Sequence, residues 1–157
     1  MRLIINADDY AITHAVSSSI IRLFEVGAIS TTSVMVVCGG AEKDCQQLIK
    51  SGFVNRAGVH LQTTGKNFKP ILSAEKVPSL VDEEGFFLQK TDPETTNPQE
   101  LAQEWEAQIQ LAHDLFGAKP NHLDTHHHVH MQRTFTPIYL NLAEKYGLPV
   151  RGGFEPS

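Results

Sequence analysis

Residues 117–137, GAKPNHLDTHHHVHMQRTFTP, contain the pattern that decides the fold. Gly117 is typical of a helix C-terminus, and residues 121–125 form a short run that we predict to be a strand. Thr136 and Pro137 are typical of a helix start, because proline is favoured at the first helical position. A helix, a strand and a second helix in this order indicate parallel strands joined by helical crossovers.

The same alternation extends towards the N-terminus. Asn97 followed by Pro98 predicts the start of the helix that stops at Gly117. Apolar residues recur with a helical period after His14, and a glycine follows each of the two earlier predicted helices. The predicted strands are 2–6, 31–37, 57–61, 121–125 and 148–151, and the predicted helices are 14–26, 41–50, 97–116 and 136–147.

Length limits the architecture that these elements can form. A chain of 157 residues is expected to be one domain, residues 1–157. A complete eight-stranded βα barrel rarely fits under about 200 residues. The sequence therefore predicts an α/β domain with parallel strands, which is a small doubly wound sheet, a partial barrel or a piece of a longer protein.

Residues 62–97 differ from the rest of the chain. They have no sustained helical period, and they contain a predicted hairpin whose arms are 79–81 and 86–88. A long irregular insertion in a compact domain is usually functional or mobile. We expect this segment to be an insertion or lid over the site.

Composition excludes several classes of protein. The hydrophobic fraction of 41%, the charged fraction of 20% and the net charge of −5 are those of an ordinary globular protein without a basic nucleic-acid footprint. The apolar run after Met1 is too short for a signal peptide or a membrane span. Cys38 and Cys45 do not have metal-type or disulfide spacing, so a reduced cytoplasmic location is expected.

Polar residues lie at the ends of the predicted strands. Asp8 and Asp9 follow the first strand and His60 lies near the end of the third. Asp124 and His126 end the fourth strand, and Arg151 ends the last. Because the carboxyl ends of parallel strands form one rim, we expect these side chains to converge there.

The acidic pair Asp8 and Asp9 permits two interpretations. Adjacent carboxylates are costly to crowd together unless a cation or acid–base chemistry uses them. One could bind a divalent metal while its neighbour acts as a base. The alternative is a solvated turn in which Asp9 or Thr13 caps the following helix.

Five of the eight histidines lie between His122 and His130. Neutral imidazole is the commonest metal ligand, and its second nitrogen needs a carboxylate or carbonyl partner. A strand would direct His126 and His128 to one side, whereas a helix would place His126 and His130 on one face. A solvated histidine-rich loop is the alternative to a metal site.

The set of two imidazoles and one carboxylate also leaves the reaction open. With a divalent metal and a nearby base it suits hydrolysis of an amide. The same ligands form the facial triad of non-haem Fe(II) oxygenases. A third reading is a catalytically incomplete fragment that binds metal or sugar.

Four motifs together resemble the YdjC-like carbohydrate deacetylases. They are Asn-Ala-Asp-Asp-Tyr at 6–10, Gly-Val-His-Leu at 58–61, Ser-Leu-Val-Asp-Glu-Glu-Gly-Phe-Phe at 79–87 and Lys-Pro-Asn-His-Leu-Asp-Thr-His-His-His-Val-His at 119–130. The resemblance implies an irregular βα barrel that hydrolyses N-acetyl groups on sugars such as chitooligosaccharides. It also implies a role for five residues: Asp9, His60 and His126 as metal ligands, Asp8 as the base and Arg151 as the residue that orients Asp8.

The ligand types and the composition add the cofactor and the partners, and the resemblance adds a missing segment. The cofactor would be one divalent ion, Zn or Mg first and Mn, Co or Ni next, because the ligands are nitrogen and oxygen atoms without a thiolate. The partners would be a small carbohydrate, with no nucleic acid and no membrane, and a second copy of the chain in a homodimer, because a barrel interrupted after its fifth strand leaves an open edge at residues 148–151. Members of the family run about a hundred residues longer, and a later histidine resembles the general acid. Since this chain ends soon after Arg151, we expect a truncated form with poor activity.

Overall fold

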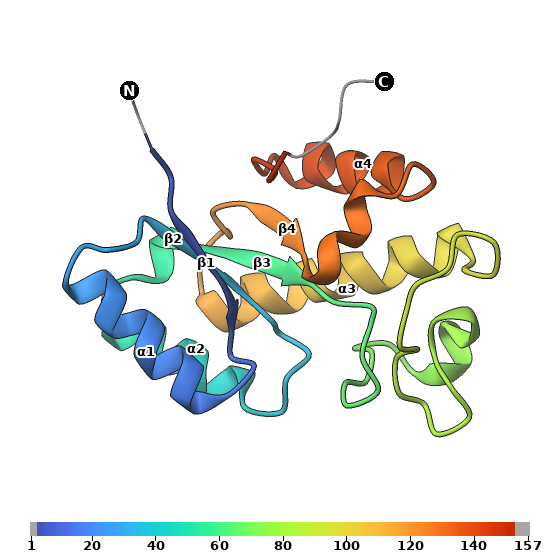
Figure 1. Ribbon diagram of the computed structural model, residues 1–157, viewed down its shortest axis with the longest axis horizontal. Helices are drawn as coiled ribbons and strands as arrows, with labels where there is room; N and C mark the ends of the chain where they lie inside the picture. The colour runs from blue at the N-terminus through green and yellow to red at the C-terminus, as the bar shows by residue number, and fades with distance from the viewer. Residues whose placement is uncertain (1–2, 153–157) are drawn as a thin grey trace.

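The computed structural model describes residues 3–152, and its framework is a parallel sheet flanked by helices (Figure 1). Within these residues the sheet has four strands in the order β1-β2-β3-β4. The strands are β1 (Asn6–Tyr10), β2 (Thr31–Val34), β3 (Ala57–Leu61) and β4 (Leu123–Thr125). The helices are α1 (His14–Glu25), α2 (Ala41–Lys50), α3 (Pro98–Phe116) and α4 (Thr136–Tyr146). The predicted α/β class with parallel strands is confirmed, and the arrangement is that of a partial barrel.

The helices begin and end where the sequence indicates. Thr13 and Asn97 cap α1 and α3 by accepting hydrogen bonds from the backbone N–H groups of Val16 and Gln99. Gly117 and Gly147 end α3 and α4 in the left-handed conformation, which glycine adopts without a steric penalty. Each predicted helix is therefore found, with ends that differ by one residue or less.

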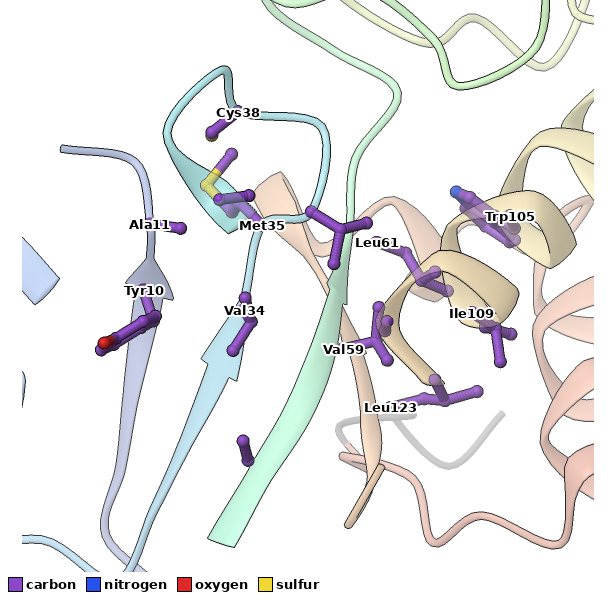
Figure 2. Close-up of a cluster of buried hydrophobic side chains, with 14 of the residues drawn as sticks. Tyr10, Ala11, Val34, Met35, Cys38, Val59, Leu61, Trp105, Ile109 and Leu123 are labelled. Atoms are coloured by element: carbon purple, nitrogen blue, oxygen red, sulfur yellow. The ribbon is translucent and has the colours of Figure 1, made fainter. Parts of the chain in front are cut away.

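One face of the sheet packs against the helices. Val59 and Leu61 on β3, and Leu123 on β4, point towards Ile109 and Trp105 of α3 (Figure 2). Because side chains alternate along a strand, Gly58 and His60 face the opposite side. The apolar core thus lies under the helices, and the polar side chains of β3 and β4 share the other face.

The prediction for the first strand is wrong in its position. Arg2 lies outside the described residues, and β1 begins only at Asn6. The apolar run Leu3-Ile4-Ile5 is exposed. The Ile5 carbonyl accepts hydrogen bonds from the backbone N–H groups of Ser30 and Thr31, and the Ile5 N–H donates to the Ser30 hydroxyl. Hydrophobicity alone does not set the position of this strand. Its pairing with β2 does, because Asn6 lies opposite Thr31. Asp8 and Asp9 therefore lie inside β1 instead of following it.

Three other strand boundaries also differ from the prediction. β2 ends at Val34, because its partner β1 ends at Tyr10, and residues 36–40 turn into α2. β4 begins at Leu123, although Asn121 already donates a backbone hydrogen bond to Ala57. Residues 148–151 make a single parallel bridge, between Val150 and Leu123, in place of a full strand.

The insertion is ordered by contacts with α3. Residues 62–97, all of which the structure describes, contain two short 3-10 helices, and the predicted hairpin is reduced to one bridge between Val81 and Phe87. The buried carboxylate of Glu104 accepts backbone hydrogen bonds from Ile71 and Leu72, and burial raises its pKa. Glu100 on the same helix accepts a further hydrogen bond from the Ser79 N–H, so backbone groups of the insertion are bonded to α3 at two places.

The expectations about disulfide bonds and membrane-spanning segments can be compared with the fold. Cys38 and Cys45 are both buried free thiols. No helix within residues 3–152 combines the length and the apolar character that crossing a bilayer requires.

Candidate metal centre

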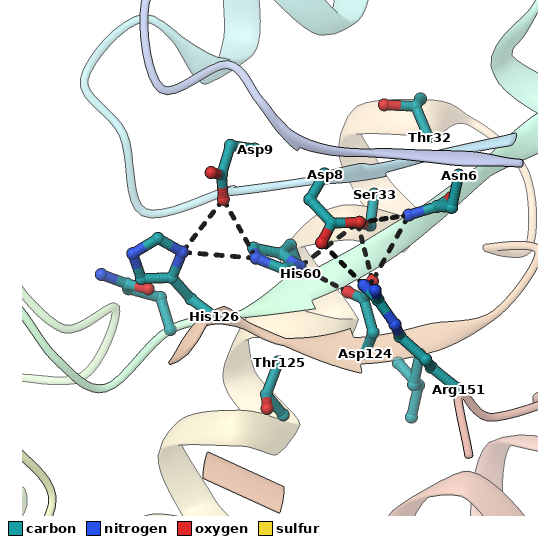
Figure 3. Close-up of polar contacts among 12 residues, drawn as sticks. Asn6, Asp8, Asp9, Thr32, Ser33, His60, Asp124, Thr125, His126 and Arg151 are labelled. Atoms are coloured by element: carbon teal, nitrogen blue, oxygen red, sulfur yellow. Dashed lines mark hydrogen bonds and ion pairs between the residues drawn. The ribbon is translucent and has the colours of Figure 1, made fainter. Parts of the chain in front are cut away.

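A bulge in β1 turns two adjacent carboxylates towards the same site. The pairing with β2 shifts register between Ala7 and Tyr10, and Asp9 adopts a left-handed backbone conformation with φ of 63°. In a regular strand Asp8 and Asp9 would face opposite sides. Here both face the site (Figure 3). A left-handed non-glycine residue is strained, although aspartate tolerates it better than most, and such strain is found mainly at functional positions.

Hydrogen bonds hold the strained turn after Asp9. The Ile12 N–H donates to the Asp9 carbonyl at 3.1 Å, and the Ala11 N–H donates to the Ser17 hydroxyl at 3.0 Å. Ser17 in turn donates to the buried Asp44 carboxylate. The backbone turn that follows Asp9 is therefore anchored to buried groups on α1 and α2.

Asp9, His60 and His126 bring three ligand atoms together (Figure 3). The Asp9 Oδ1 atom lies 3.0 Å from His60 Nε2 and 3.0 Å from His126 Nδ1. The two ring nitrogens are 3.3 Å apart. Ligands placed about 2.0–2.2 Å from one ion are separated by about 3.0–3.4 Å in octahedral or tetrahedral geometry. The three residues fit a single small divalent cation.

A second carboxylate orients His60 from behind. Asp124 Oδ1 accepts a hydrogen bond from His60 Nδ1 at 2.5 Å, and Ser33 donates to Asp124 Oδ2 at 2.9 Å. With the hydrogen on Nδ1, the Nε2 lone pair faces Asp9 and His126. This carboxylate–histidine arrangement is the one that supports metal-ligating imidazoles in proteins.

Charge is balanced within this group. Burial lowers the pKa of His60, but hydrogen bonds to Asp124 and Asp9 outweigh it and raise the pKa to about 9. Hydrogen bonds from His126 and His60 hold the pKa of Asp9 well below its usual range. Without an ion, a proton on His60 therefore supplies positive charge beside Asp9, as a bound metal cation would.

Asp8 and Arg151 form a separate pair beside the three ligands. Arg151 donates from Nη1 to Asp8 Oδ2 at 2.7 Å and also lies 3.5 Å from Asp124 Oδ2. The Asn6 amide donates to Asp8 Oδ1 at 2.6 Å. The Asp8 carboxylate, whose side chain is 33% exposed, is thus fixed at both oxygens while remaining open to solvent.

The histidine tract forms neither the strand nor the α-helix that we considered. His127 and His128 both have φ of 55°, which kinks the short 3-10 segment His126–Met131. His130 is buried, lies 2.6 Å from the Thr125 hydroxyl and packs on Tyr139. His126 is therefore the member of the tract that joins the ligand group.

Three supporting residues were not assigned a role from the sequence. Ser33 is a buried polar residue in β2, Asn6 precedes the acidic pair, and Asp124 was noted only as a strand end. Ser33 stands among β-branched neighbours, and a buried hydroxyl at such a position requires a partner. That requirement was the available signal, but only the register identifies the partner as Asp124.

Comparisons with known proteins identify the family of this chain. A family model described as YdjC-like protein matches residues 2–157. A carbohydrate deacetylase from Enterococcus faecalis is 39% identical over 152 residues, which are 96% of this chain and 58% of the relative. A chitooligosaccharide deacetylase from Serratia marcescens is 32% identical over 95% of this chain and 58% of its own length. This chain thus spans less than two thirds of the length of these relatives.

A solved structure extends the likeness to three dimensions. It comes from Enterococcus faecalis V583 and is proposed to be a cellobiose-phosphate cleavage protein. It superposes with a TM-score of 0.88 at 37% identity and covers 95% of this chain and 57% of that one. Sequence and fold lead to the same conclusion: the chain belongs to the YdjC-like protein family.

Proposed function

We propose that this chain carries the metal site of a hydrolase that removes N-acetyl groups from amino-sugar oligosaccharides. The observation that carries the proposal is the Asp9–His60–His126 group with the Asp8 carboxylate beside it. Relatives named carbohydrate or chitooligosaccharide deacetylase support the choice of reaction.

Asp9, His60 and His126 would hold the ion. Two imidazoles and one carboxylate suit Zn²⁺, while Mg²⁺, Mn²⁺, Co²⁺ and Ni²⁺ remain compatible with the set. When bound, a divalent ion polarises a carbonyl and acidifies water. Because a divalent ion takes four or more ligands, three protein ligands would leave at least one position for water or substrate.

Asp8 would act as the general base. Its oxygens accept hydrogen bonds from Asn6 and Arg151, and each still has a lone pair for the proton of an attacking water. Arg151 keeps the carboxylate in one orientation through its hydrogen bond to Asp8 Oδ2. Asp8 therefore removes the water proton as the acetyl carbon is attacked, and Arg151 positions Asp8.

The same ligands occur in non-haem iron oxygenases, and a short chain could also bind sugar without turnover. The base beside the ligands and the names of the relatives favour hydrolysis. The deacetylase, the oxygenase and the sugar-binding chain differ in the product that they release, or in releasing none, so one experiment separates them.

The test is release of acetate from N,N′-diacetylchitobiose by the 157-residue chain. We expect release that stops after chelation, returns with Zn²⁺ and is lost in Asp8→Asn. Asp114→Asn, an exposed change on α3, is the matched control. Oxygen consumption with a 2-oxo acid, without release of acetate, would contradict hydrolysis and indicate an oxygenase. Sugar binding without any product would indicate an incomplete enzyme.

We also propose that the chain forms a homodimer, through the outer side of β1 in place of the expected edge at residues 148–151, which make only one bridge. Leu3, Ile4 and Ile5 are exposed beside this edge strand, and exposed apolar strand edges favour association. Light scattering should give twice the chain mass, and Ile4→Lys should reduce it to one. A wild-type monomer would contradict the proposal.

A further inference from the structure

A hollow of about 320 Å³ opens at the carboxyl ends of β1 and β2, the end of the sheet that also carries Asp9. Its walls are the loop after β1, the loop after β2 and residues 67–68 of the insertion. Ala11 on one wall follows Asp9 by two residues, so the hollow begins within about 8 Å of the metal ligand along the chain. Figure 2 shows Ala11 and Cys38 at this end of the sheet.

The volume of the hollow limits what it can hold. Small-molecule pockets in proteins span about 300–1,000 Å³. This hollow is at the lower end of that range, so it suits one ring and not a whole oligosaccharide. Gly39 and Gly40 lie in its wall, and a Cβ at either would meet no atom of residues 3–152 within 4 Å apart from the adjacent residues, so a larger side chain can be placed there.

His14 presents a polar atom of fixed direction in the wall. Its Nδ1 lies 2.7 Å from Asp44 Oδ1, and the other oxygen of Asp44 accepts from Ser17. Because a carboxylate only accepts, the hydrogen of the neutral ring is on Nδ1 and Nε2 is left available. Within residues 3–152, Nε2 has no protein partner, and the His14 side chain is 61% exposed.

The Asp44 carboxylate that holds His14 is itself immobilised. It is buried at the base of the hollow, and its backbone carbonyl accepts a hydrogen bond from the buried Tyr10 hydroxyl. An imidazole fixed by a buried carboxylate loses little conformational entropy on binding a ligand. His14 is consequently a preorganised hydrogen-bonding group that the metal centre does not use.

The remaining lining matches the two chemical characters of a sugar ring. Phe68 offers apolar surface, while Asn67 and Lys43 add hydrogen-bond donors. A pyranose has a C–H face that packs on apolar surface and hydroxyl groups around its edge. An aromatic wall with a few placed polar groups is typical of small-molecule sites.

We propose that this hollow is a subsite for a second sugar residue, next to the N-acetylated residue at the metal centre, with His14 as its hydrogen-bonding group and Phe68 as its apolar wall. The proposal rests on the proposed function, because it assumes that the acetylated sugar lies at the metal. It adds that His14 and Phe68, which lie outside the metal centre, determine how tightly the neighbouring sugar residue is held.

The experiment compares two ligands in calorimetry, N-acetylglucosamine and N,N′-diacetylchitobiose. The Zn²⁺-loaded 157-residue chain carries Asp8→Asn, which limits turnover during the titration. His14→Ala removes the hydrogen-bonding group at the first position of α1, outside the core. Gly39→Phe adds bulk at the wall of the hollow, and His113→Ala, an exposed change on α3, is the control.

We expect the unsubstituted hollow to bind the disaccharide more tightly than the monosaccharide. His14→Ala should weaken disaccharide binding by about threefold to tenfold, the range of one hydrogen bond, and leave the monosaccharide unchanged. Gly39→Phe should likewise weaken binding of the disaccharide and leave that of the monosaccharide unchanged. His113→Ala should change neither affinity.

Two results would overturn the subsite. One is disaccharide binding that His14→Ala and Gly39→Phe leave unaltered, and the other is no disaccharide binding by the unsubstituted hollow. A chain that binds the disaccharide through His14 but whose Asp8-containing form releases no acetate would keep the subsite and lose the proposed function. The two proposals therefore fail separately.

Discussion

The three ligands and the Asp8–Arg151 pair lie side by side but are held in different ways. His60 is buried and is fixed from behind by Asp124, which is itself fully buried. The side chains of Asp8 and Arg151 are 33% and 40% exposed. An imidazole that is buried and has a partner at each ring nitrogen is suited to hold an ion in one place. An exposed carboxylate, in contrast, can exchange protons with water. The contrast suggests that binding and proton transfer are divided between adjacent residues.

The largest effect should come from removing a ligand. Asp9→Ala, His60→Ala and His126→Ala should each abolish stoichiometric metal, because two remaining ligands cannot hold a divalent ion tightly. His128→Ala is the matched control, since His128 is exposed in the same tract and lies outside the ligand group. Elemental analysis of desalted protein measures this. A full equivalent of metal in His126→Ala would remove that residue from the site.

The second effect should appear in rate and not in binding. Asp8→Asn keeps the size of the side chain but removes its basicity, so turnover should fall by about a hundredfold to ten-thousandfold. Metal content should stay at one equivalent, because Asp8 lies outside the three ligands. Acetate release and elemental analysis on one preparation give both values. Joint loss of metal and activity would mean that Asp8 is a ligand.

A smaller effect is expected at the supporting carboxylate. Asp124→Asn leaves the three ligands in place but weakens the hydrogen bond that orients His60. Changes at such supporting groups usually reduce metal affinity by about tenfold to a hundredfold. Chelator competition would measure the Zn²⁺ dissociation constant, with Asp114→Asn as the exposed control. An unchanged constant would show that His60 does not depend on Asp124.

The smallest effect is a change of stability with pH in the metal-free protein. The pKa of His60 is raised to about 9 from an ordinary value of 6.5, so its stabilising contribution is complete below about pH 6.5 and is lost as pH rises through 9. This one group should lower the free energy of unfolding by about 1–3 kcal/mol across that window.

Urea denaturation with chelator at several pH values checks the sign. His60→Asn should flatten the decrease. With saturating Zn²⁺ the trend should reverse between pH 6.5 and 9, because the ion binds neutral imidazole and competes with the proton. Metal-free stability that rises with pH in this window would be opposite to the expectation.

Helix ends and strand identity were predictable, because they depend on local chemistry. Thr13, Asn97, Gly117 and Gly147 act in the structure as their residue types indicate. The first strand was misplaced, since the exposed run Leu3-Ile4-Ile5 resembles a buried strand until its pairing is known. Register is a property of two strands, and one segment does not contain it.

The site was predictable in part for a similar reason. The resemblance selected Asp9, His60 and His126 from a chain with eight histidines, and the structure brings these three side chains together. The bulge that turns Asp9 beside Asp8 depends on how β1 pairs with β2. The links from Ser33 to Asp124 and from Asp44 to His14 join residues 91 and 30 positions apart, which no local pattern reveals.

The most direct test of the metal centre is a crystal structure of the chain grown with Zn²⁺, with data collected at the zinc absorption edge. We expect one strong anomalous peak about 2.0–2.2 Å from Asp9 Oδ1, His60 Nε2 and His126 Nδ1, with the three ligand atoms close to their present separations. A peak at His128 or His130, or one bound by Asp8 in place of Asp9, would contradict the account.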